Sequence, residues 1–407
     1  MEKSAAIAAS MTAAPTEVQR PRELPRRWSG GHIKALDGLR GCAVLAVMFY
    51  HFMAPELTAH AHGGLVLWLQ KASAVGWCGV DLFFVLSGFL ITGILLDAKG
   101  SQTYFKSFYV RRILRIFPLY FGVITAAFIG SHIRAVSDLF GFEDVTASFA
   151  WLYAFLSNVY VSIHHNKNAF GPMGHFWSLA VEEHFYMIWP ALVYLCSRRQ
   201  LAVACAVMVV GALALRCGLA LAYPVNYASY MLTPCRVDGL ALGGLLAMIV
   251  RSHLDVTVIR RWAGVVASFC FVLILLLGFR DSRSGGFSHY GRAMTTAGFT
   301  LFTFFFTSVI ALAVSGKSGA WGRRLTENAV LMSVGKYSFA MYILHLLFLR
   351  PFSRLFPIDR LSHLLHWADG GLLCFAVLSM VSTYLLAWLS WTLYEQNFLR
   401  LKRFFPY

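Results

Sequence analysis

The sequence predicts an all-α membrane protein, a polytopic bundle of about ten transmembrane helices. Of its 407 residues, 58% are hydrophobic and only 13% are charged, whereas soluble domains carry about a quarter charged residues. The mean hydropathy is +0.62, and apolar stretches long enough to cross a bilayer recur along nearly the whole chain. The lysines and arginines behind the net charge of +16 lie mostly in short loops between these stretches. This pattern is typical of cytoplasmic loops and argues against nucleic-acid binding.

Ten stretches have the length and composition of membrane spans. In chain order they cover residues 36–53, 77–96, 108–130, 176–196, 201–222, 236–250, 262–279, 295–315, 330–349 and 370–394. An eleventh apolar stretch, 147–163, is shorter and contains Ser157 and Asn158. If this stretch does not cross, a larger share of the lysines and arginines lies on the cytoplasmic side. We therefore expect a re-entrant or interfacial helix at 147–163, and both termini in the cytoplasm.

The chain divides into three regions. Residues 1–33 are rich in Ala, Pro and Arg and lack the apolar core of a cleavable signal peptide, so we expect a disordered, basic cytoplasmic tail. Residues 34–396 form the transmembrane domain, and 397–407 are expected to be a short cytoplasmic tail. The eight cysteines lie mostly inside apolar stretches without metal-ligand spacing, so they are interpreted as packing residues and no metal site is predicted.

Arg40 and His51 share the first predicted span, LDGLRGCAVLAVMFYHF. Their separation of eleven residues, at about 100° per residue, comes to roughly three turns, so both side chains project from one helical face. They would stand about 16 Å apart along the axis. Charged or titratable groups are costly in a membrane helix and by default indicate a functional site. Of the side chains on this span, only His51 moves protons near neutral pH.

Polar residues also interrupt four later spans. They are Asp81 and Ser87 in GVDLFFVLSGFLITG, Arg112 and Arg115 in FYVRRILRIFPLY, Glu182 and Glu183 in GHFWSLAVEEHFYMIWP, and His345 in GKYSFAMYILHLLF. The second span also contains Gly79, Gly88 and Gly93, which would let neighbouring helices approach closely.

This set of motifs resembles the acyltransferase-3 family of bacterial membrane acyltransferases. The matching pieces are the Arg-x10-His of Arg40 and His51, GVDLFFVLSGFLI, the Arg-x-x-Arg of Arg112 and Arg115, FWSLAVEEHFY and YSFAMYILH, in the family's order. The resemblance implies transfer of an acyl group, usually acetyl, from cytoplasmic acyl-CoA to a hydroxyl of a glycan or another acceptor. It also implies a bacterial inner-membrane enzyme with acyl-CoA as donor substrate and no permanently bound cofactor. Because the chain ends soon after its last span, it looks like the stand-alone membrane form of the family.

The resemblance suggests roles for the basic residues. His51 suits a general base that deprotonates the acceptor hydroxyl. The alternative interpretation is a histidine at a helix end that is hydrogen-bonded or lies among lipid headgroups. Arg40 would bind a donor phosphate, polarise the thioester or pair with Asp37 one turn away. Arg112 and Arg115 are implied to contact the phosphates of CoA, the other interpretation being ordinary positive-inside residues.

The remaining candidates have two interpretations each. Glu182 would orient His51 or a neighbouring arginine, or pair structurally with Arg216 or Arg236, and Glu183 points about 100° away from it. Asp81 and Ser87 would line the donor tunnel or join helices by hydrogen bonds. His345 belongs either to the acceptor site or to the apolar interior. Five further histidines match no metal motif and are interpreted as residues of solvated outer loops: His60, His62, His164, His165 and His175.

A secondary transporter of anions or lipid-linked sugars is the alternative function, because polar residues in many spans also suit a transport path. Transporters often contain inverted repeats, however, and we find no convincing repetition here. A membrane scaffold would leave Arg40, His51 and Glu182 unexplained. The sequence does not name the acceptor, the acyl group or the oligomeric state.

Overall fold

The computed structural model describes residues 33–53, 64–223, 227–280, 287–315 and 326–407, together with the single residues 322 and 324. Within these ranges the chain is helical, and its one β-type contact is an isolated bridge between Val145 and Phe170. The predicted all-α fold is confirmed. The predicted tail at 1–33 lies outside the described residues apart from Ile33.

Ten helices of 16 to 28 residues make up most of the fold. They are α1 (Lys34–Phe52), α3 (Gly79–Ala98), α4 (Tyr104–Ser131), α8 (Trp177–Leu195), α9 (Arg198–Ala222), α11 (Thr233–Val250), α12 (Val256–Arg280), α13 (Phe299–Val314), α15 (Ala329–Leu344) and α18 (Gly370–Ser390). The shorter α-helices are α2 (Gly64–Ser73), α5 (Arg134–Phe140), α6 (Ala150–Tyr153), α7 (Ser157–His164), α10 (Ala228–Met231), α16 (Leu349–Leu355), α17 (Ile358–Leu365) and α19 (Gln396–Arg400). Four short segments are 3-10 helices: η3 (Gly76–Cys78), η4 (Phe142–Asp144), η5 (Gly171–Phe176) and η9 (Leu401–Phe404). Two are π-helical turns: η7 (Met294–Gly298) and η8 (Trp391–Glu395).

Each of the ten predicted spans falls on a helix. In the part of the chain that the structure describes, eight helical segments are long and apolar enough to cross a membrane. A ninth is counted if α15 and α16, which are bent by 91° relative to each other, form one broken span. The remaining predicted span, 176–196, corresponds to α8, in which Glu182, Glu183 and His184 interrupt the apolar sequence.

The stretch 147–163 does not form one helix. It is divided into α6, with four residues, and α7, with eight, and Phe155 between them has a φ of 54°. At about 1.5 Å per residue, neither helix is long enough to cross the hydrocarbon core of a bilayer. The structure therefore agrees with the expectation that this stretch is not a transmembrane helix.

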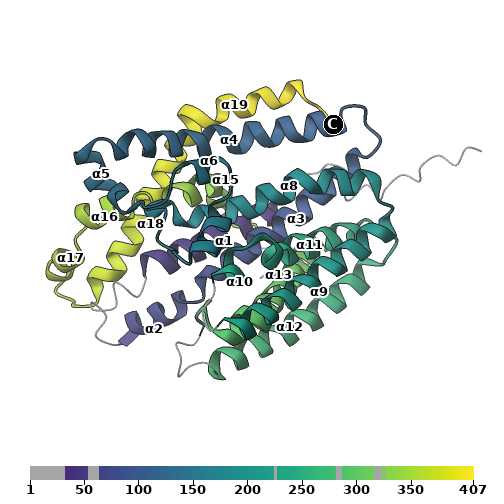
Figure 1. The fold of residues 1–407 in the computed structure, drawn as a ribbon. Coiled ribbons are helices and arrows are strands. Elements are labelled where there is room, and N and C mark those ends of the chain that lie inside the picture. Colours follow the sequence, from purple (N-terminus) through teal and green to yellow (C-terminus); the bar gives the residue numbers. More distant parts are fainter. Residues whose placement is uncertain are drawn as a thin grey trace, which may run out of the picture. The chain divides into compact units, whose positions relative to one another are not determined.

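The helices gather around α1 and α3 (Figure 1). Helix α3 packs along α11, which also contacts α9 and α13, while α12 packs on α13. Helix α1 packs along α15, and α18 contacts both of them. Helix α4 lies beside α19 and contacts α3 over a small area only.

The α1–α15 contact brings two backbones together. A Cβ atom on Gly335 would overlap the carbonyl group of Asp37, and a Cβ atom on Gly41 would overlap that of Leu331. Only glycine permits helix axes to approach this closely.

Two of the three glycines predicted to allow close helix packing do so. Gly88 lies against the backbone of Leu240 in α11, and Gly79 lies against the backbone of Ala43 in α1. Gly93 instead lies against the guanidinium group of Arg251, so it does not bring two backbones together.

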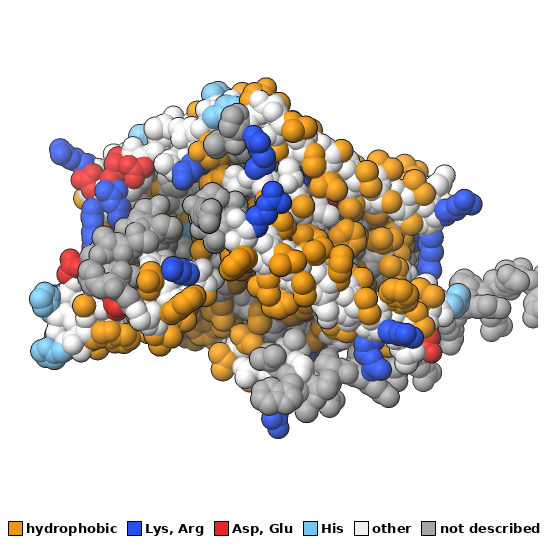
Figure 2. Space-filling view, turned by 90° about the horizontal axis from the view of Figure 1, so that it is seen from below, with side chains coloured by type: hydrophobic (Ala, Val, Ile, Leu, Met, Phe, Trp, Pro, Cys, Tyr) orange, Lys and Arg blue, Asp and Glu red, His pale blue; other side chains and the backbone are white. Residues whose placement is uncertain are grey.

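The outer surface of the fold is apolar where a soluble protein would be charged. Helix α12 exposes one stripe, spaced alternately by four and three residues, that consists of Val258, Trp262, Val265, Phe269, Val272, Leu276 and Phe279. Figure 2 shows a face on which hydrophobic side chains form a broad area, with lysines and arginines mainly at its margins. Such a surface is stable against lipid tails and not in water. The protein is therefore a multi-pass membrane protein.

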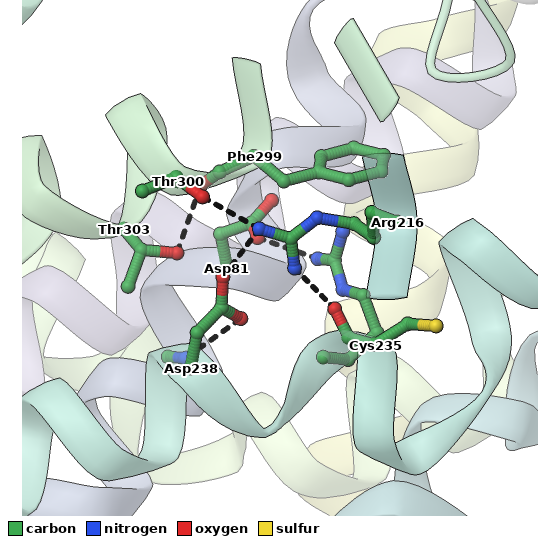
Figure 3. Close-up of polar contacts among 9 residues, drawn as sticks. Asp81, Arg216, Cys235, Asp238, Phe299, Thr300 and Thr303 are labelled. Atoms are coloured by element: carbon green, nitrogen blue, oxygen red, sulfur yellow. Dashed lines mark hydrogen bonds and ion pairs between the residues drawn. The ribbon is translucent and has the colours of Figure 1, made fainter. Parts of the chain in front are cut away.

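Two buried ion pairs join α3, α9 and α11, and a hydrogen bond links them to α13 (Figure 3). Arg216 lies 2.9 Å from Asp238, and Arg236 pairs with Asp81; all four side chains are at most 3% exposed. Arg216 also donates a hydrogen bond to Thr300 at 2.5 Å. Isolated charges would be costly in this interior, so each cation is compensated by a carboxylate.

The predicted tail at 397–407 packs against α4. Arg111 donates hydrogen bonds to the carbonyl oxygens of Lys402 and Phe405, both at 3.1 Å. Its guanidinium carbon lies 5.1 Å from the centroid of the Tyr407 ring. The cytoplasmic location of this segment remains a prediction.

Replacing Gly335 by Ala should destabilise the fold, because the added methyl group forces α15 away from α1. Overpacking of this kind typically costs about 1–3 kcal/mol, so we expect a lower midpoint of thermal unfolding. Unfolding of the detergent-solubilised protein is monitored by size-exclusion chromatography after heating. Gly211→Ala is the matched control, since a Cβ there meets nothing within 4 Å and alanine is the better helix former. Equal thermal midpoints for the two variants would contradict the proposed role of the α1–α15 contact.

Candidate active site

A cavity of about 100 Å³ lies between α1, α3, α4, α8 and α15. Five of the residues that the sequence singled out line it together: Arg40 from α1, Ser87 from α3, Arg112 and Arg115 from α4, and Glu182 from α8. Ser178, Tyr186 and Tyr342 contribute further polar groups, and the rest of the wall is apolar. Residues from distant parts of the sequence thus converge on one cavity.

The arginines give this cavity an excess of positive charge. Arg112 and Arg115 are one turn apart on α4, and within the described ranges neither forms an ion pair. Arg112 lies over the Tyr186 ring, 5.3 Å from its centroid. Arg40 reaches Asp37 at 3.5 Å, as anticipated from their spacing. Glu182 lines the same cavity but is outnumbered by three arginines. Guanidinium groups outside ion-pair distance of a carboxylate suit an anionic ligand such as phosphate.

Glu182 is held by hydroxyl groups. The Tyr186 hydroxyl donates to Glu182 Oε2 at 3.1 Å and is itself in hydrogen-bond contact with Ser87. The predicted alternative, a pair with Arg216 or Arg236, does not form, because those arginines bind Asp238 and Asp81. Sequence reasoning missed Tyr186, although its position four residues after Glu182, on the same helical face, was the available signal.

The adjacent Glu183 faces a second cavity, as its helical position predicts. This cavity of about 140 Å³ is lined by α4, α8 and the segment around Phe155. Arg112 and Tyr186 line both cavities, so their side chains separate the two spaces. Exposed Met187 also lines the second cavity, at its outer side.

Asp81 does not line either cavity. It is 2% exposed and paired with Arg236, which corresponds to the interpretation that it joins helices. Its predicted contact with substrate remains untested. Ser87, by contrast, does line the arginine cavity.

His51 lies outside the lining of the arginine cavity and contacts a second histidine. Its Nδ1 lies 3.1 Å from Nε2 of His345 and 3.0 Å from the carbonyl oxygen of Val47. His345 is fully buried, and its Nδ1 lies 2.7 Å from the carbonyl oxygen of Tyr342. Because Tyr342 also lines the cavity, the histidine pair and the arginines belong to one connected site.

The expectation that His175 is a solvated loop residue is wrong. Its side chain is 5% exposed, and its Nε2 lies 2.8 Å from the same Tyr342 carbonyl oxygen. Burial lowers the pKa of His175, in η5, to about 3, so the ring is neutral at physiological pH. Its place directly before the FWSLAVEEHFY motif was the signal that could have identified it.

The other histidines of that group divide differently. His164 and His165 are exposed, as expected, and His60 and His62 lie outside the described residues. No group of three or more His, Cys, Asp or Glu side chains suits a metal ion in the described part of the chain.

The arrangement supplies the parts that acyl transfer needs. Arginines can hold an anionic donor, a histidine can accept a proton, and polar hydroxyl groups lie between them. No solved structure matches the chain.

Comparisons with known proteins agree with this chemistry. The chain is 37% identical over 177 residues to the peptidoglycan O-acetyltransferase OatA of Listeria monocytogenes, covering 41% of this chain and 25% of that protein. It is 28% identical to a putative O-acetyltransferase of Staphylococcus aureus, over 77% of this chain and 50% of the relative. A putative peptidoglycan O-acetyltransferase of Bacillus subtilis, YrhL, is 36% identical over 39% of this chain and 23% of its own. The chain spans half or less of the length of these relatives. Residues 33–392 match the model described as an acyltransferase domain, and the chain therefore belongs to the acyltransferase-3 family.

Proposed function

We propose that this protein is a membrane-bound O-acyltransferase that moves an acetyl group from cytoplasmic acetyl-CoA to a hydroxyl of a cell-envelope or exported glycan. The observation that carries the proposal is the cavity in which Arg112 and Arg115 present unpaired positive charge, connected through Tyr342 to the pair of His51 and His345. Family membership supports acyl transfer. The names of the relatives, which include peptidoglycan O-acetyltransferases, support acetyl as the group and a cell-wall glycan as the acceptor.

In this proposal the donor enters from the cytoplasm and its phosphates bind Arg112 and Arg115. A rigid guanidinium fork binds phosphate oxygens in pairs, and two forks on one helical face suit a pyrophosphate. The cavity of about 100 Å³ is small, which favours a short acyl group such as acetyl over a long chain.

His51 acts as general base. It takes the proton of the acceptor hydroxyl as the oxygen attacks the thioester carbon, the carbon–sulfur bond breaks, and the CoA thiolate leaves and recovers the proton. Arg40 lines the same cavity as Arg112 and Arg115 and contacts a donor phosphate. The hydrogen bond from Tyr186 holds the Glu182 carboxylate in the wall of the arginine-lined cavity, where it forms no ion pair with the arginines.

The distribution of charge supports an orientation for this reaction. We place both termini in the cytoplasm of a bacterial cell, Arg40 and the α4 arginines toward the inner face of the inner membrane, and His51 toward the outer face. The acceptor glycan then approaches from outside, near α6 and α7. In this scheme acyl-CoA and the glycan are the two substrates, and no resident cofactor takes part.

Replacing His51 by Ala should lower transfer at least ~100-fold, because a general base typically contributes 10²–10⁴ in rate. Membranes receive acetyl-CoA labelled in the acetyl group, and label in the glycan fraction is counted per amount of inserted protein. His253→Ala, at an exposed position between α11 and α12, is the matched control and should behave as wild type. Undiminished transfer by His51→Ala would exclude it as the base, and no transfer by wild type from acetyl- or succinyl-CoA would favour the transporter.

Replacing Arg115 by Ala should raise KM for acetyl-CoA about 10- to 100-fold while kcat changes little, since hydrogen bonds to charged groups contribute about 1.5–3 kcal/mol. The same assay is run with acetyl-pantetheine, which lacks the nucleotide phosphates. The preference of the wild type for acetyl-CoA over this donor should shrink in Arg115→Ala and persist in Arg261→Ala, a control at an exposed position of α12. An unchanged preference in Arg115→Ala would contradict the phosphate contact.

A further inference from the structure

We propose that His345 is a positioning residue that holds His51 in the tautomer with hydrogen on Nδ1, leaving Nε2 of His51 as the basic nitrogen. The inference rests on the proposed function, in which His51 takes the proton of the acceptor. It assigns His345 a role different from binding the acceptor, and it specifies which nitrogen of His51 reacts.

The tautomer of His345 follows from its backbone contact. Its Nδ1 lies 2.7 Å from the carbonyl oxygen of Tyr342. A carbonyl oxygen can only accept a hydrogen bond, so Nδ1 of His345 carries hydrogen. A neutral imidazole has one N–H group, and Nε2 of His345 therefore presents a lone pair.

The tautomer of His51 follows from two contacts that agree. Its Nδ1 lies 3.1 Å from Nε2 of His345 and 3.0 Å from the carbonyl oxygen of Val47. Both partners are acceptors, so Nδ1 of His51 is the donor. The lone pair of His51 consequently lies on Nε2, which is the nitrogen available to a hydroxyl group.

The surroundings make His345 a support for His51 and keep it from meeting the acceptor. His345 is 0% exposed, whereas His51 is partly exposed. The carbonyl group that anchors His345 also accepts a hydrogen bond from His175 Nε2, at 2.8 Å. The hydroxyl group of the anchoring Tyr342 lies 2.6 Å from that of Ser178, which lines the arginine cavity.

This arrangement favours proton uptake by His51. When Nε2 of His51 accepts a proton, the ring becomes a cation whose Nδ1–H group still donates to Nε2 of His345. The acceptor lone pair stabilises that cation and fixes the ring, as a third group orients the base in other acyl-transfer sites. No proton has to move onto His345.

Two substitutions of His345 separate positioning from structural support. The side-chain amide of His345→Gln reaches the place of Nε2 and can accept from His51. That of His345→Asn reaches only the place of Nδ1, so it can donate to Tyr342 but leaves His51 with only the Val47 carbonyl of its two acceptors. Transfer is measured with labelled acetyl-CoA and membranes. We expect kcat of His345→Asn to fall about 100-fold, which is the low end of the contribution of a general base. The KM for acetyl-CoA should stay unchanged. His345→Gln should retain most of the activity.

The opposite order, an active His345→Asn and an inactive His345→Gln, would overturn the inference by showing that the contact with Tyr342 is what matters. Equal activity of both variants and wild type would overturn it too. His253→Asn and His253→Gln, at an exposed position between α11 and α12, are matched controls. If His51→Ala stays active, the proposed base fails; if it is inactive while His345→Asn is fully active, only the positioning role fails.

A second measurement does not depend on variants of His345 folding. Wild type labelled with ¹⁵N-histidine is placed in lipid nanodiscs, and the signals that disappear in His51→Ala identify the two nitrogens of His51. A hydrogen-bearing Nδ1 and a bare Nε2 would support the inference. A hydrogen-bearing Nε2 in the neutral ring would overturn it.

Discussion

The site depends on the backbone contact between α1 and α15. Gly41 and Gly335 lack the Cβ atoms that would separate these helices. As a result, His51 near the end of α1 reaches His345, which follows α15 directly, within 3.1 Å. The same two helices carry Arg40 and Tyr342 to the wall of the cavity. The relative positions of these site residues therefore depend on the close packing at Gly41 and Gly335.

The arginines inside this fold form two groups, which differ in whether a carboxylate pairs with them. Arg216 and Arg236 are sealed in the interior and bound to carboxylates of neighbouring helices, which makes them part of the framework. Arg112 and Arg115 line a cavity and have no carboxylate partner among the described residues. Since unpaired charge in a membrane protein is costly, the second group agrees with the proposed anionic donor, which would supply negative charge. The first group needs no such ligand, because its carboxylates are part of the fold.

The sequence predicted the helices well because length and apolarity decide what a bilayer accepts. It also predicted most of the cavity, since Arg40, Arg115 and Glu182 are residue types that a span does not keep without a partner. It did not predict which partners they have. Asp81 and Arg236 are 155 residues apart in the chain, and such a pairing follows from how α3 and α11 pack, which local periodicity does not encode. For the same reason, buried His175 was assigned to a solvated loop.

The contact of the last residues with α4 affects how the protein is handled in the laboratory. Arg111, next to Arg112, is bound by carbonyl groups of Lys402 and Phe405 and lies near the Tyr407 ring. A purification tag or fluorescent fusion joined directly behind that tyrosine would add bulk beside the helix that supplies the donor arginines. An inactive fusion of this kind would report on the label and not on the enzyme.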